Sequence, residues 1–544
     1  MFLCDTPNLV SSSEVIAGVI DHDALLAELR VDSCRPTPLP AMLPNWRRAP
    51  WPTLNDRLAE EMQAVLQINN INDAWTAWKT TLVGCVSEYA KGASGPNGVL
   101  AVLLKRFAKT LCPSLAHIFN LSLRACDLPA DWKCAAVTPI PKDGEKSDLR
   151  YYRPISVTSL VGKLLEKQAR NQLAGFLDTN KALPDNQHGF RERRSCTTML
   201  LRTLDSWTAA TDKNSGGNVH AIFLDWAKAF DKVPHQRLLS KLQHHGIDGT
   251  ALEWLKISLS AVGSVLGPLL FNVYVSDLPA VVKTNLVQYA DDCTIFREVT
   301  SQDDVDELQE DLALIDIWCV NNGMQLNAKK CVAMDLSRAR QPWLPQYMIG
   351  GAVLEYVSTQ RLLGVHIARD LHWNHQVDVQ RKKAAQTLGF AARNLRGCTQ
   401  RVKRMAYLTL VKPKLFYGTP AWHPWTKTNT EKMARTQNKA LHFIHGRHVP
   451  PPEKQNMLSV PAQLAYNDLL FFKKSLCGLT EYNAMARITE GRVHRGDDPL
   501  HPRLQQPTAR TELGQNAFDY RIVAEWNAAP PAIKDCSAAQ FPAV

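Results

Sequence analysis

The 13 cysteines of this 544-residue chain form no CxxC pair and no Cys/His group with the spacing of zinc ligands. We therefore expect reduced thiols in the core rather than a disulfide framework or a zinc site. The chain also lacks a run of 18 apolar residues, so we expect no membrane span and no membrane partner. Its first residues lack the basic stretch and apolar core of a secretory signal, so we expect an intracellular protein of the cytoplasm or nucleus.

What is present suits a large enzyme with several subdomains, because 544 residues are too many for one core. Apolar residues make up 45% of the chain and charged residues 21%, which is ordinary for a globular protein. The net charge is +11 at pH 7 and the isoelectric point is near 9.0. That charge favours a polyanionic partner without proving one.

The most informative stretch is YADD at 289–292, which lies between two apolar runs, 286–289 and 293–296. Both runs predict short buried strands, so Asp291 and Asp292 should sit on the tight turn between them. Two adjacent carboxylates are costly to bury unpaired, and a divalent cation removes that cost. Oxygen-only ligands favour Mg²⁺ over zinc. A solvated Asp-Asp turn is the alternative, and this stretch alone does not decide between them.

A third carboxylate, Asp225, ends another apolar run at 219–224 and precedes a predicted helical turn at 226–231. A carboxylate at a strand end can meet Asp291 and Asp292 on a neighbouring strand. Three such aspartates can hold two Mg²⁺ ions, which activate a 3′-hydroxyl and stabilise leaving pyrophosphate in in-line phosphoryl transfer. Asp231 lies about two helical turns away, and we interpret it as a cap or an ion-pair partner.

FLD at 223–225, KAFD at 228–231 and YADD at 289–292 resemble the reverse transcriptase domain of non-LTR (LINE-type, jockey-like) retrotransposons. The resemblance runs from about residue 92 to about residue 443. Further blocks follow in the family's order: GASGPNG at 92–98, DWK at 131–133, PIPK at 139–142, YRPIS at 152–156, QHGFR at 187–191, GSVLGP at 263–268, DLP at 277–279, LN at 326–327, KK at 329–330 and LGV at 363–365.

The resemblance implies an α+β, right-hand polymerase fold with fingers, a ferredoxin-like palm and a helical thumb. It implies an RNA-directed DNA polymerase that uses two Mg²⁺ ions, with Mn²⁺ as an alternative. The implied partners are an RNA template, a DNA primer and deoxynucleoside triphosphates. The implied divisions are an endonuclease C-terminal remnant at 1–30, a linker and helical segment at 31–91, fingers at 92–216, palm at 217–350, a thumb-like basic helical region at 351–450, and a region of unknown role at 451–544.

Local patterns predict helices over 54–89, 99–126 and 160–177 and a strand over 133–141. Ser301 and Asp304 have the spacing of a capping box, so a helix should begin there. Its apolar stripe should pack against the sheet of the palm, and consists of Val305, Leu308, Leu312, Ile315 and Cys319.

Two arginines lie in the finger-like blocks. We expect Arg191 to bind the nucleotide triphosphate, because a guanidinium forks onto two oxygens. Arg153 should contact the template backbone or form a structural ion pair. Lys330 is expected either to protonate the leaving pyrophosphate or to pair with acids of the palm. Phe190 and Tyr289 are candidates to stack near the base or sugar, although Tyr289 suits the core equally.

Residues 381–414 hold ten lysines and arginines and no acidic residue, on a helical pattern. The segment follows the palm, where the family places its thumb. We expect it to follow the phosphates of the template–primer duplex, with a plain solvated face as the alternative.

The chain departs from the family pattern at two places. Val262 stands where relatives have the Gln of a Pro-Gln-Gly-Ser motif before Gly263, a candidate for template or nucleotide binding, and the hairpin leading into it is missing. A basic helical segment is also missing between Tyr89 and Gly92. The chain thus resembles a truncated or internally deleted copy of such an element. The alternative function is a catalytically impaired nucleic-acid-binding remnant, and a maturase-like splicing cofactor is less favoured because the C-terminal part shows no maturase segment.

Overall fold

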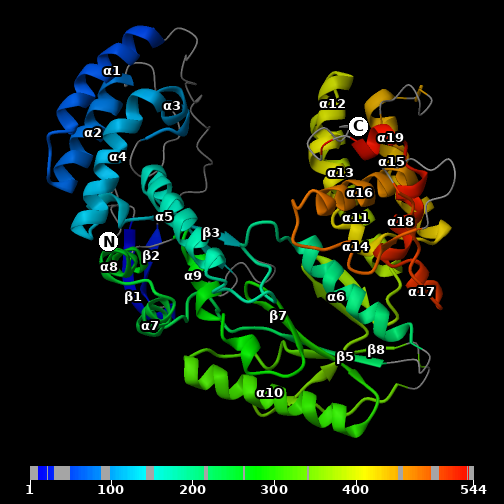
Figure 1. Ribbon diagram of the computed structural model, residues 1–544. Helices are drawn as coiled ribbons and strands as arrows, with labels where there is room; N and C mark the ends of the chain where they lie inside the picture. Colours follow the sequence, from blue (N-terminus) through cyan, green and yellow to red (C-terminus); the bar gives the residue numbers. More distant parts are fainter. Residues whose placement is uncertain are drawn as a thin grey trace. The chain divides into compact units, whose positions relative to one another are not determined.

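The structure is a computed structural model, and it forms two compact units (Figure 1). Unit 1 comprises Met1–Leu183 and Lys228–Val275, and unit 2 comprises Pro184–Ala227 and Ser276–Val544. Only the backbone is described for 10–20, 22–29 and Arg153. The described residues are 10–20, 22–29, 50–86, 99–141, 152–213, 218–260, 264–337, 339, 342–446, 448–450, 457–491, 502–535 and 537.

In its described residues, unit 1 consists mainly of helices and has two antiparallel strand pairs. β1 (Val10–Ile20) pairs with β2 (His22–Leu29), and β3 (Ala136–Pro141) pairs with β4 (Tyr152–Val157). The predicted strand over 133–141 is thus confirmed from Ala136 onward. The helices are α1 (Trp51–Val65), α2 (Ile71–Val86), α3 (Ala101–Arg106), α4 (Ala108–Ala125), α5 (Leu160–Thr179), α7 (His235–His244), α8 (Gly249–Leu259) and α9 (Gly267–Tyr274).

Buried tryptophans join the first helices of unit 1. Trp75 and Trp78 of α2 stack with ring centroids 5.5 Å apart. The indole N–H of Trp78 donates to Ser114 Oγ on α4 over 3.1 Å. The predicted helix over 54–89 is two helices, α1 and α2, separated at residues 66–70, while the helices predicted over 99–126 and 160–177 are confirmed as α3 with α4 and as α5.

Unit 2 is built on a five-stranded sheet with the order β11-β8-β5-β7-β6. The central strand β5 runs antiparallel to both β7 and β8, and β6 pairs antiparallel with β7. Helices α6 and α10 cover the two faces of the sheet (Figure 1). The strands are β5 (Asn218–Leu224), β6 (Asn285–Tyr289), β7 (Asp292–Val299), β8 (Val332–Leu336) and β11 (Glu355–Tyr356), and the two helices are α6 (Cys196–Thr211) and α10 (Gln302–Asn322).

The predicted capping box at Ser301 is confirmed. The Ser301 side chain accepts from the backbone N–H of Asp304, and Oδ2 of Asp304 accepts from the N–H of Ser301 over 3.0 Å. The residues of the predicted apolar stripe on α10 are all buried. On the opposite face, Trp207 of α6 packs edge-on against Phe223 and Phe296, with centroid distances of 6.3 and 5.7 Å. Apolar packing on both faces therefore fixes the strands whose ends carry the aspartates.

The remaining elements of unit 2 are β9 (Met348–Ile349), β10 (Ala352–Val353), β12 (Thr359–Leu362), β13 (Val365–Ala368), α11 (Asn374–Asn394), α12 (Gln400–Ala406), a π-helical turn (Tyr407–Val411), α13 (Lys412–Leu415), α14 (Thr419–Trp422), α15 (Lys427–His445), α16 (Val460–Leu476), β14 (Thr489–Glu490), β15 (Leu504–Gln505), α17 (Glu512–Gln515), α18 (Phe518–Ala528) and α19 (Pro531–Asp535).

Most of these elements share one continuous core with the sheet. Buried side chains from α6 and β5 through α18 belong to a single cluster. The C-terminal helices α16 and α18 are thus packed with the sheet rather than apart from it.

Helices and a mainly antiparallel sheet make the chain α+β, as predicted. Across the described ranges, every helix is too short or too polar to cross a membrane. The boundaries of the two units lie at 183/184, 227/228 and 275/276. The divisions predicted from the sequence are drawn by family resemblance, and they stay predictions.

Candidate active site

Asp225 follows the last residue of β5, and its backbone is held on both sides. Its carbonyl oxygen accepts from Asn327 N over 2.7 Å, and its N–H donates to Cys331 Sγ over 3.4 Å. The carboxylate is 44% exposed, and Oδ2 lies 3.7 Å from Lys330 Nζ. The buried strand therefore ends in a fixed backbone that presents a carboxylate to solvent.

Asp291 and Asp292 lie on the predicted turn between β6 and β7, where Tyr289 pairs with Asp292. Ala290 in this turn has φ +56°, a left-handed conformation that costs a non-glycine residue about 1–2 kcal/mol. Leu224 pairs with Cys293 across β5 and β7, so the register sets Asp225 opposite Asp292. Directly opposite residues on antiparallel strands have Cβ atoms about 5 Å apart and point to the same face. The three aspartates therefore converge at one end of the sheet.

The electrostatics of the three aspartates are those of crowded like charges. Desolvation, then Asp291 and Asp225, raise the pKa of Asp292 to about 6. Desolvation and Asp225 also raise the pKa of Asp291. Both side chains reach the surface, so the surrounding protein desolvates them only in part. Among the described residues, neither carboxylate has a cationic side chain within 4.0 Å, so no ion pair with a protein cation neutralises the charge at the turn.

Lys330, Phe190, Tyr289 and Arg191 all belong to unit 2, as the aspartates do. Lys330 is 68% exposed beside Asp225. Phe190 is exposed with φ +56°. Tyr289 is partly buried against the core, and burial together with its contact to Cys196 raises its pKa to about 12. Arg191 donates through Nη1 to Pro184 O over 2.7 Å.

The side chain of Arg153 and the whole of Gly263, two of the predicted site residues, lie outside the described residues. Arg153 lies in β4 of unit 1, opposite Ile140, and its side chain is outside the described residues. Gly263 and Val262 are themselves outside the described residues. The segments around 89–98, including the gap after Tyr89, are also outside them. Their predicted roles remain predictions.

Two residues beside the turn, Gln187 and Arg361, have no role predicted from the sequence. Gln187 is 1% exposed, and its Oε1 accepts from Ala290 N over 2.9 Å. Arg361 on β12 lies near enough to Asp292 to lower its pKa, against the larger effects of burial and of the other aspartates. Gln187 had a signal, because it belongs to the QHGFR block. Arg361 had none, since it lies two residues before the LGV block at 363–365 and belongs to no block itself.

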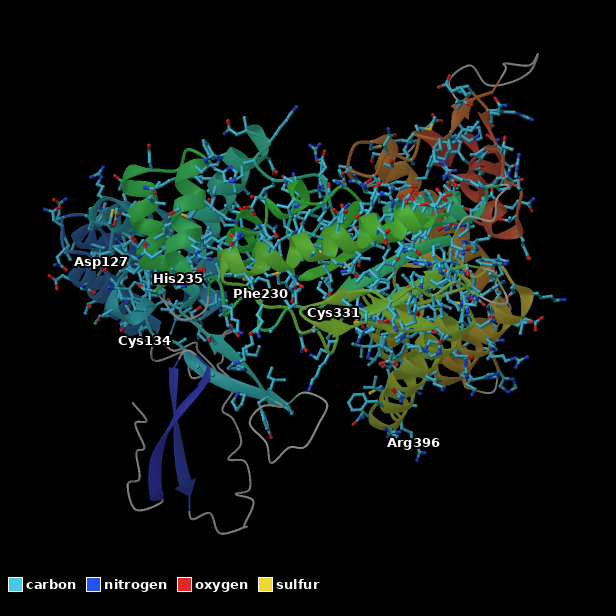
Figure 2. All side chains as sticks on the ribbon, turned by 90° about the horizontal axis from the view of Figure 1, so that it is seen from below. Asp127, Cys134, Phe230, His235, Cys331 and Arg396 are labelled. Atoms are coloured by element: carbon cyan, nitrogen blue, oxygen red, sulfur yellow. The ribbon has the colours of Figure 1, made fainter. Side chains whose placement is uncertain are left out.

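The basic segment, residues 381–414, spans α11, α12, the π-helical turn and α13. Its exposed cations are Lys382, Lys383, Arg393, Arg396, Arg401 and Lys414. Figure 2 shows Arg396 at the outer end of this segment. Other cations are engaged within the fold: Arg381 lies 3.7 Å from Asp378, and Lys403 lies 5.7 Å from the ring centroid of Phe443.

A cavity of about 540 Å³ opens between the basic segment and the β12–β13 hairpin. Three cations line it, Arg361, Lys383 and Lys414, and its described lining includes no acidic side chain. Lys414 Nζ donates to Thr387 Oγ1 on the same wall over 2.8 Å. Such a lining attracts phosphate groups by charge alone.

A second polar cluster joins α14, α16 and α18. His423, Asp468 and Glu525 bring ligand atoms within 4.8 Å of one another, as a metal site would. Burial opposes ionisation of Asp468, but Arg521 and His423 outweigh it and hold its pKa below the usual range. Arg521 Nε donates to Asp468 Oδ2 over 2.8 Å, and His423 Nδ1 lies 2.7 Å from the same oxygen. Burial, then Asp468, raise the pKa of Glu525 to about 8.

Arg521 already supplies the positive charge that a metal would bring to this second cluster. The guanidinium also donates to Pro420 O and, over 2.8 Å, to Asn516 O. We interpret the cluster as a structural tie between α18 and the helices before it.

Replacing Arg521 by methionine should therefore lower the free energy of unfolding by roughly 3–5 kcal/mol, because Asp468 is left charged and 0% exposed without its main partner. Urea denaturation measures this change. The matched control is Arg510→Met, at an exposed arginine, which should cost less than about 1 kcal/mol. Equal effects of the two substitutions would show that the cluster does not stabilise unit 2.

Residues 140–390 match the sequence model of the family described as reverse transcriptase (RNA-dependent DNA polymerase). This part of the chain is a reverse transcriptase domain. The matched residues include β5, the Asp-Asp turn and Lys330, together with most of α11. The predicted α+β polymerase fold is thereby confirmed.

The similar proteins belong to non-LTR retrotransposons, as the sequence analysis predicted. The reverse transcriptase domain and its flanks are 28% identical over 389 residues to the probable RNA-directed DNA polymerase from transposon BS of Drosophila melanogaster, covering 65% of this chain and 43% of that protein. Identity is 29% over 370 residues to the RNA-directed DNA polymerase from mobile element jockey of the same species, covering 61% and 40%. The chain thus matches less than half the length of these relatives.

Among solved structures, a telomerase from Candida albicans in complex with a fragment of telomeric RNA aligns with 78% of this chain and 75% of its own. The sequence identity is 10% and the TM-score 0.34.

Proposed function

We propose that this chain is the reverse transcriptase of a non-LTR retrotransposon and synthesises DNA on an RNA template. The single observation that carries the proposal is the convergence of Asp225, Asp291 and Asp292 at one sheet end inside the matched family segment. In the proposed reaction the 3′-hydroxyl of a DNA primer attacks the α-phosphate of a deoxynucleoside triphosphate, and pyrophosphate leaves.

The donor set fits hard divalent cations, Mg²⁺ or Mn²⁺, because it offers only carboxylate oxygens. Burial, and after it the neighbouring aspartates, raise the pKa values of Asp291 and Asp292, and a bound cation would offset both effects. Of the described residues, only the second cluster gathers three ligand atoms within 4.8 Å of one another. That the aspartates bind two ions is proposed from the family resemblance. Bound there, the ions would lower the pKa of the attacking hydroxyl and neutralise the leaving pyrophosphate.

The chain's own residues orient the reactants around this centre. Asp225, Asp291 and Asp292 fix the end of the sheet at which the primer terminus is activated. Lys330, exposed beside Asp225, supplies a proton or a positive charge to pyrophosphate. Arg191 binds the triphosphate, and Phe190, which is exposed, stacks near the base or sugar.

The template–primer duplex is proposed to lie along the basic segment. Lys382, Arg396 and Arg401 are all exposed, and we propose neutralising them together. The plot of the logarithm of the association constant for the duplex against the logarithm of the salt concentration should become flatter by up to about 3, because each lost phosphate contact removes about 0.9 from its slope. Fluorescence anisotropy across a salt series measures the slope.

The control for this duplex-binding test neutralises Lys213 and Lys283, whose ion pairs with Glu298 and Glu310 already cancel their charge. It should leave the slope unchanged. An unchanged slope in the triple variant would assign the basic segment to solvation.

The alternative, a catalytically impaired remnant that binds nucleic acid, is favoured by one observation in the sequence. Val262 stands where the resembled family has the glutamine of its Pro-Gln-Gly-Ser motif. The hairpin that precedes this motif in the family is also missing before Gly263. The three aspartates do not supply the template seat that this segment is expected to form. Both functions predict duplex binding, and only the first predicts extension of a primer.

A further inference from the structure

Residues 186–189 lie alongside β6, the strand that leads into the Asp-Asp turn. The N–H of Gln288 donates to Asn186 O, and the N–H of His188 donates to Gln288 O, each over 2.8 Å. Asn186 also donates through Nδ2 to Leu286 O over 2.6 Å. The segment therefore acts as a parallel partner at the edge of β6.

Gln187 extends this contact from the strand to the turn itself. Its Oε1 accepts from Gly189 N over 2.8 Å and from Ala290 N over 2.9 Å, and its Nε2 donates to Ala290 O over 3.4 Å. One buried amide thus engages both backbone polar groups of Ala290, the residue that holds the left-handed conformation of the turn. Asp291 and Asp292 follow directly.

Gly189 makes this close approach geometrically feasible. A Cβ atom at this position would lie 2.3 Å from the backbone nitrogen of Ala290 and 3.0 Å from its Cα. No side chain fits there without moving the turn. The two segments therefore pack backbone to backbone, with Gln187 bridging them.

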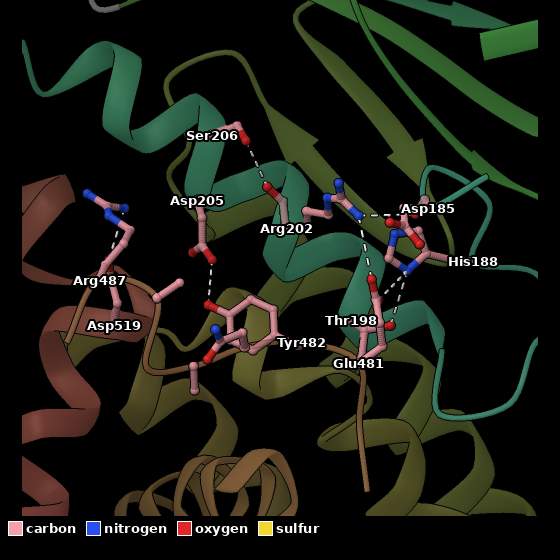
Figure 3. Close-up of a pocket in the computed structure, with 13 residues that line it drawn as sticks. Asp185, His188, Thr198, Arg202, Asp205, Ser206, Glu481, Tyr482, Arg487 and Asp519 are labelled. Carbon is pink, nitrogen blue, oxygen red and sulfur yellow. Dashed lines mark hydrogen bonds and ion pairs between the residues drawn. The ribbon is translucent and has the colours of Figure 1, made fainter. Parts of the chain in front are cut away.

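The C-terminal part of unit 2 supports Gln187 from the other side. Arg194, whose side chain is 5% exposed, donates through Nη1 to Gln187 O over 3.1 Å, and its Nη2 lies 3.4 Å from Glu481 Oε1. Glu481 N donates to Arg193 O over 2.9 Å. Figure 3 shows Glu481 beside Arg202 and His188, and all three line a cavity of about 380 Å³.

We propose that Gln187 is a positioning residue for the polymerase reaction: its amide fixes the turn that carries Asp291 and Asp292, and the C-terminal region completes this support through Glu481 and Arg194. The inference rests on the proposed function for its kinetic consequences. The hydrogen bonds themselves can be tested without any catalysis. The proposal gives Glu481 of the C-terminal region a task in the reaction although it is not itself a reacting group.

The test compares Gln187→Met, which keeps the length of the side chain and loses its hydrogen bonds, with Gln187→Glu, which keeps the accepting oxygen. Hydrogen–deuterium exchange of the full chain should show faster exchange of the Ala290 amide in Gln187→Met than in the wild type, with Gln187→Glu in between. Exchange in β5 should be unchanged in all three, which separates release of the turn from unfolding. Unchanged exchange at Ala290 in Gln187→Met would overturn the proposal.

Kinetics supply the second readout. Gln187→Met should extend primers about 10–100-fold more slowly and need a higher Mg²⁺ concentration for half-maximal rate, as expected when support of metal ligands is removed. The Kd for template–primer duplex should stay the same. A wild type that extends no primer would refute the proposed function, yet the exchange experiment would still decide the role of Gln187.

Glu481→Gln covers the case in which Gln187→Met does not fold, since Glu481 is 29% exposed and its backbone contact is kept. It should speed exchange at Ala290 in the same direction by a smaller factor. In the double variant the two effects should be less than additive, because both act on one support. Full additivity, or no effect of Glu481→Gln on Ala290, would remove the C-terminal region from the proposal.

Discussion

Replacing Asp291 by asparagine should reduce RNA-templated primer extension by more than about a hundredfold, the upper loss for a metal's outer-shell partners. Asparagine keeps the shape of the side chain and removes the charge that would hold a cation. Single-turnover primer extension with enzyme in excess measures the loss. This assay also detects extension by the unsubstituted chain if that chain extends primers slowly. The effect should appear in the rate of extension and not in the Kd for the duplex.

The matched control for Asp291→Asn is Asp303→Asn, at an exposed aspartate in the first turn of α10. It should leave extension within about twofold, because an exposed helix-end charge contributes only a small stabilisation. In metal-free buffer at pH 7 the Asp291→Asn chain should have an equal or higher Tm. In the unsubstituted chain the pKa of the Asp291 carboxyl is raised in the folded state, so its ionised form at pH 7 disfavours the fold. Asparagine removes this unfavourable charge. Equal losses of extension in both variants would contradict the assignment of Asp291.

Restoring the family's hairpin and Pro-Gln ahead of Gly263 should raise the rate of primer extension by on the order of a hundredfold over the chain as it stands. In-line transfer needs a closely held nucleotide, and a displacement of about 1 Å can cost that factor. The comparison is primer extension on an RNA template by the restored chain and the original chain, each with and without Asp291→Asn.

The control for this comparison inserts a Gly/Ser segment of equal length, which restores spacing without the motif. It should recover little of the rate. Robust extension by the unrestored chain, abolished by Asp291→Asn, would show that the segment at Val262 is dispensable. Equal recovery by the Gly/Ser insert would show that length rather than the motif matters.

Local sequence patterns were sufficient to predict the elements that carry the aspartates. The runs at 219–224, 286–289 and 293–296 are short and apolar, and they are β5, β6 and the start of β7. Ser301 with Asp304 marks the start of α10 because a capping box is a local signal. The register that sets Asp225 opposite Asp292 is not local, and no pattern in the sequence specifies it.

The contacts that support the site were beyond sequence reasoning for the same reason. Gln187 and Ala290 are 103 residues apart. Elsewhere in unit 2, Asp212 accepts from Thr511 N over 2.8 Å, and these two residues are 299 apart. A glutamine in a loop and an aspartate after a helix look like ordinary solvated residues until the fold brings their partners to them. The helical turn predicted at 226–231 is a hydrogen-bonded turn in which Asp231 N donates to Lys228 O over 3.1 Å. Lys228 has φ +55°, a conformation that helical periodicity does not signal.

The most direct test of the proposed metal site at Asp225, Asp291 and Asp292 maps where a divalent cation binds. Fe²⁺ in place of Mg²⁺, with ascorbate and peroxide, generates radicals that cut the polypeptide next to the ion, and mass spectrometry identifies the cuts. Cuts are expected near Asp225 and at Asp291 and Asp292, and they should be lost in the Asp291→Asn chain. Cuts confined to the surroundings of His423, Asp468 and Glu525, or cuts near Asp225 that survive Asp291→Asn, would contradict the proposed metal site.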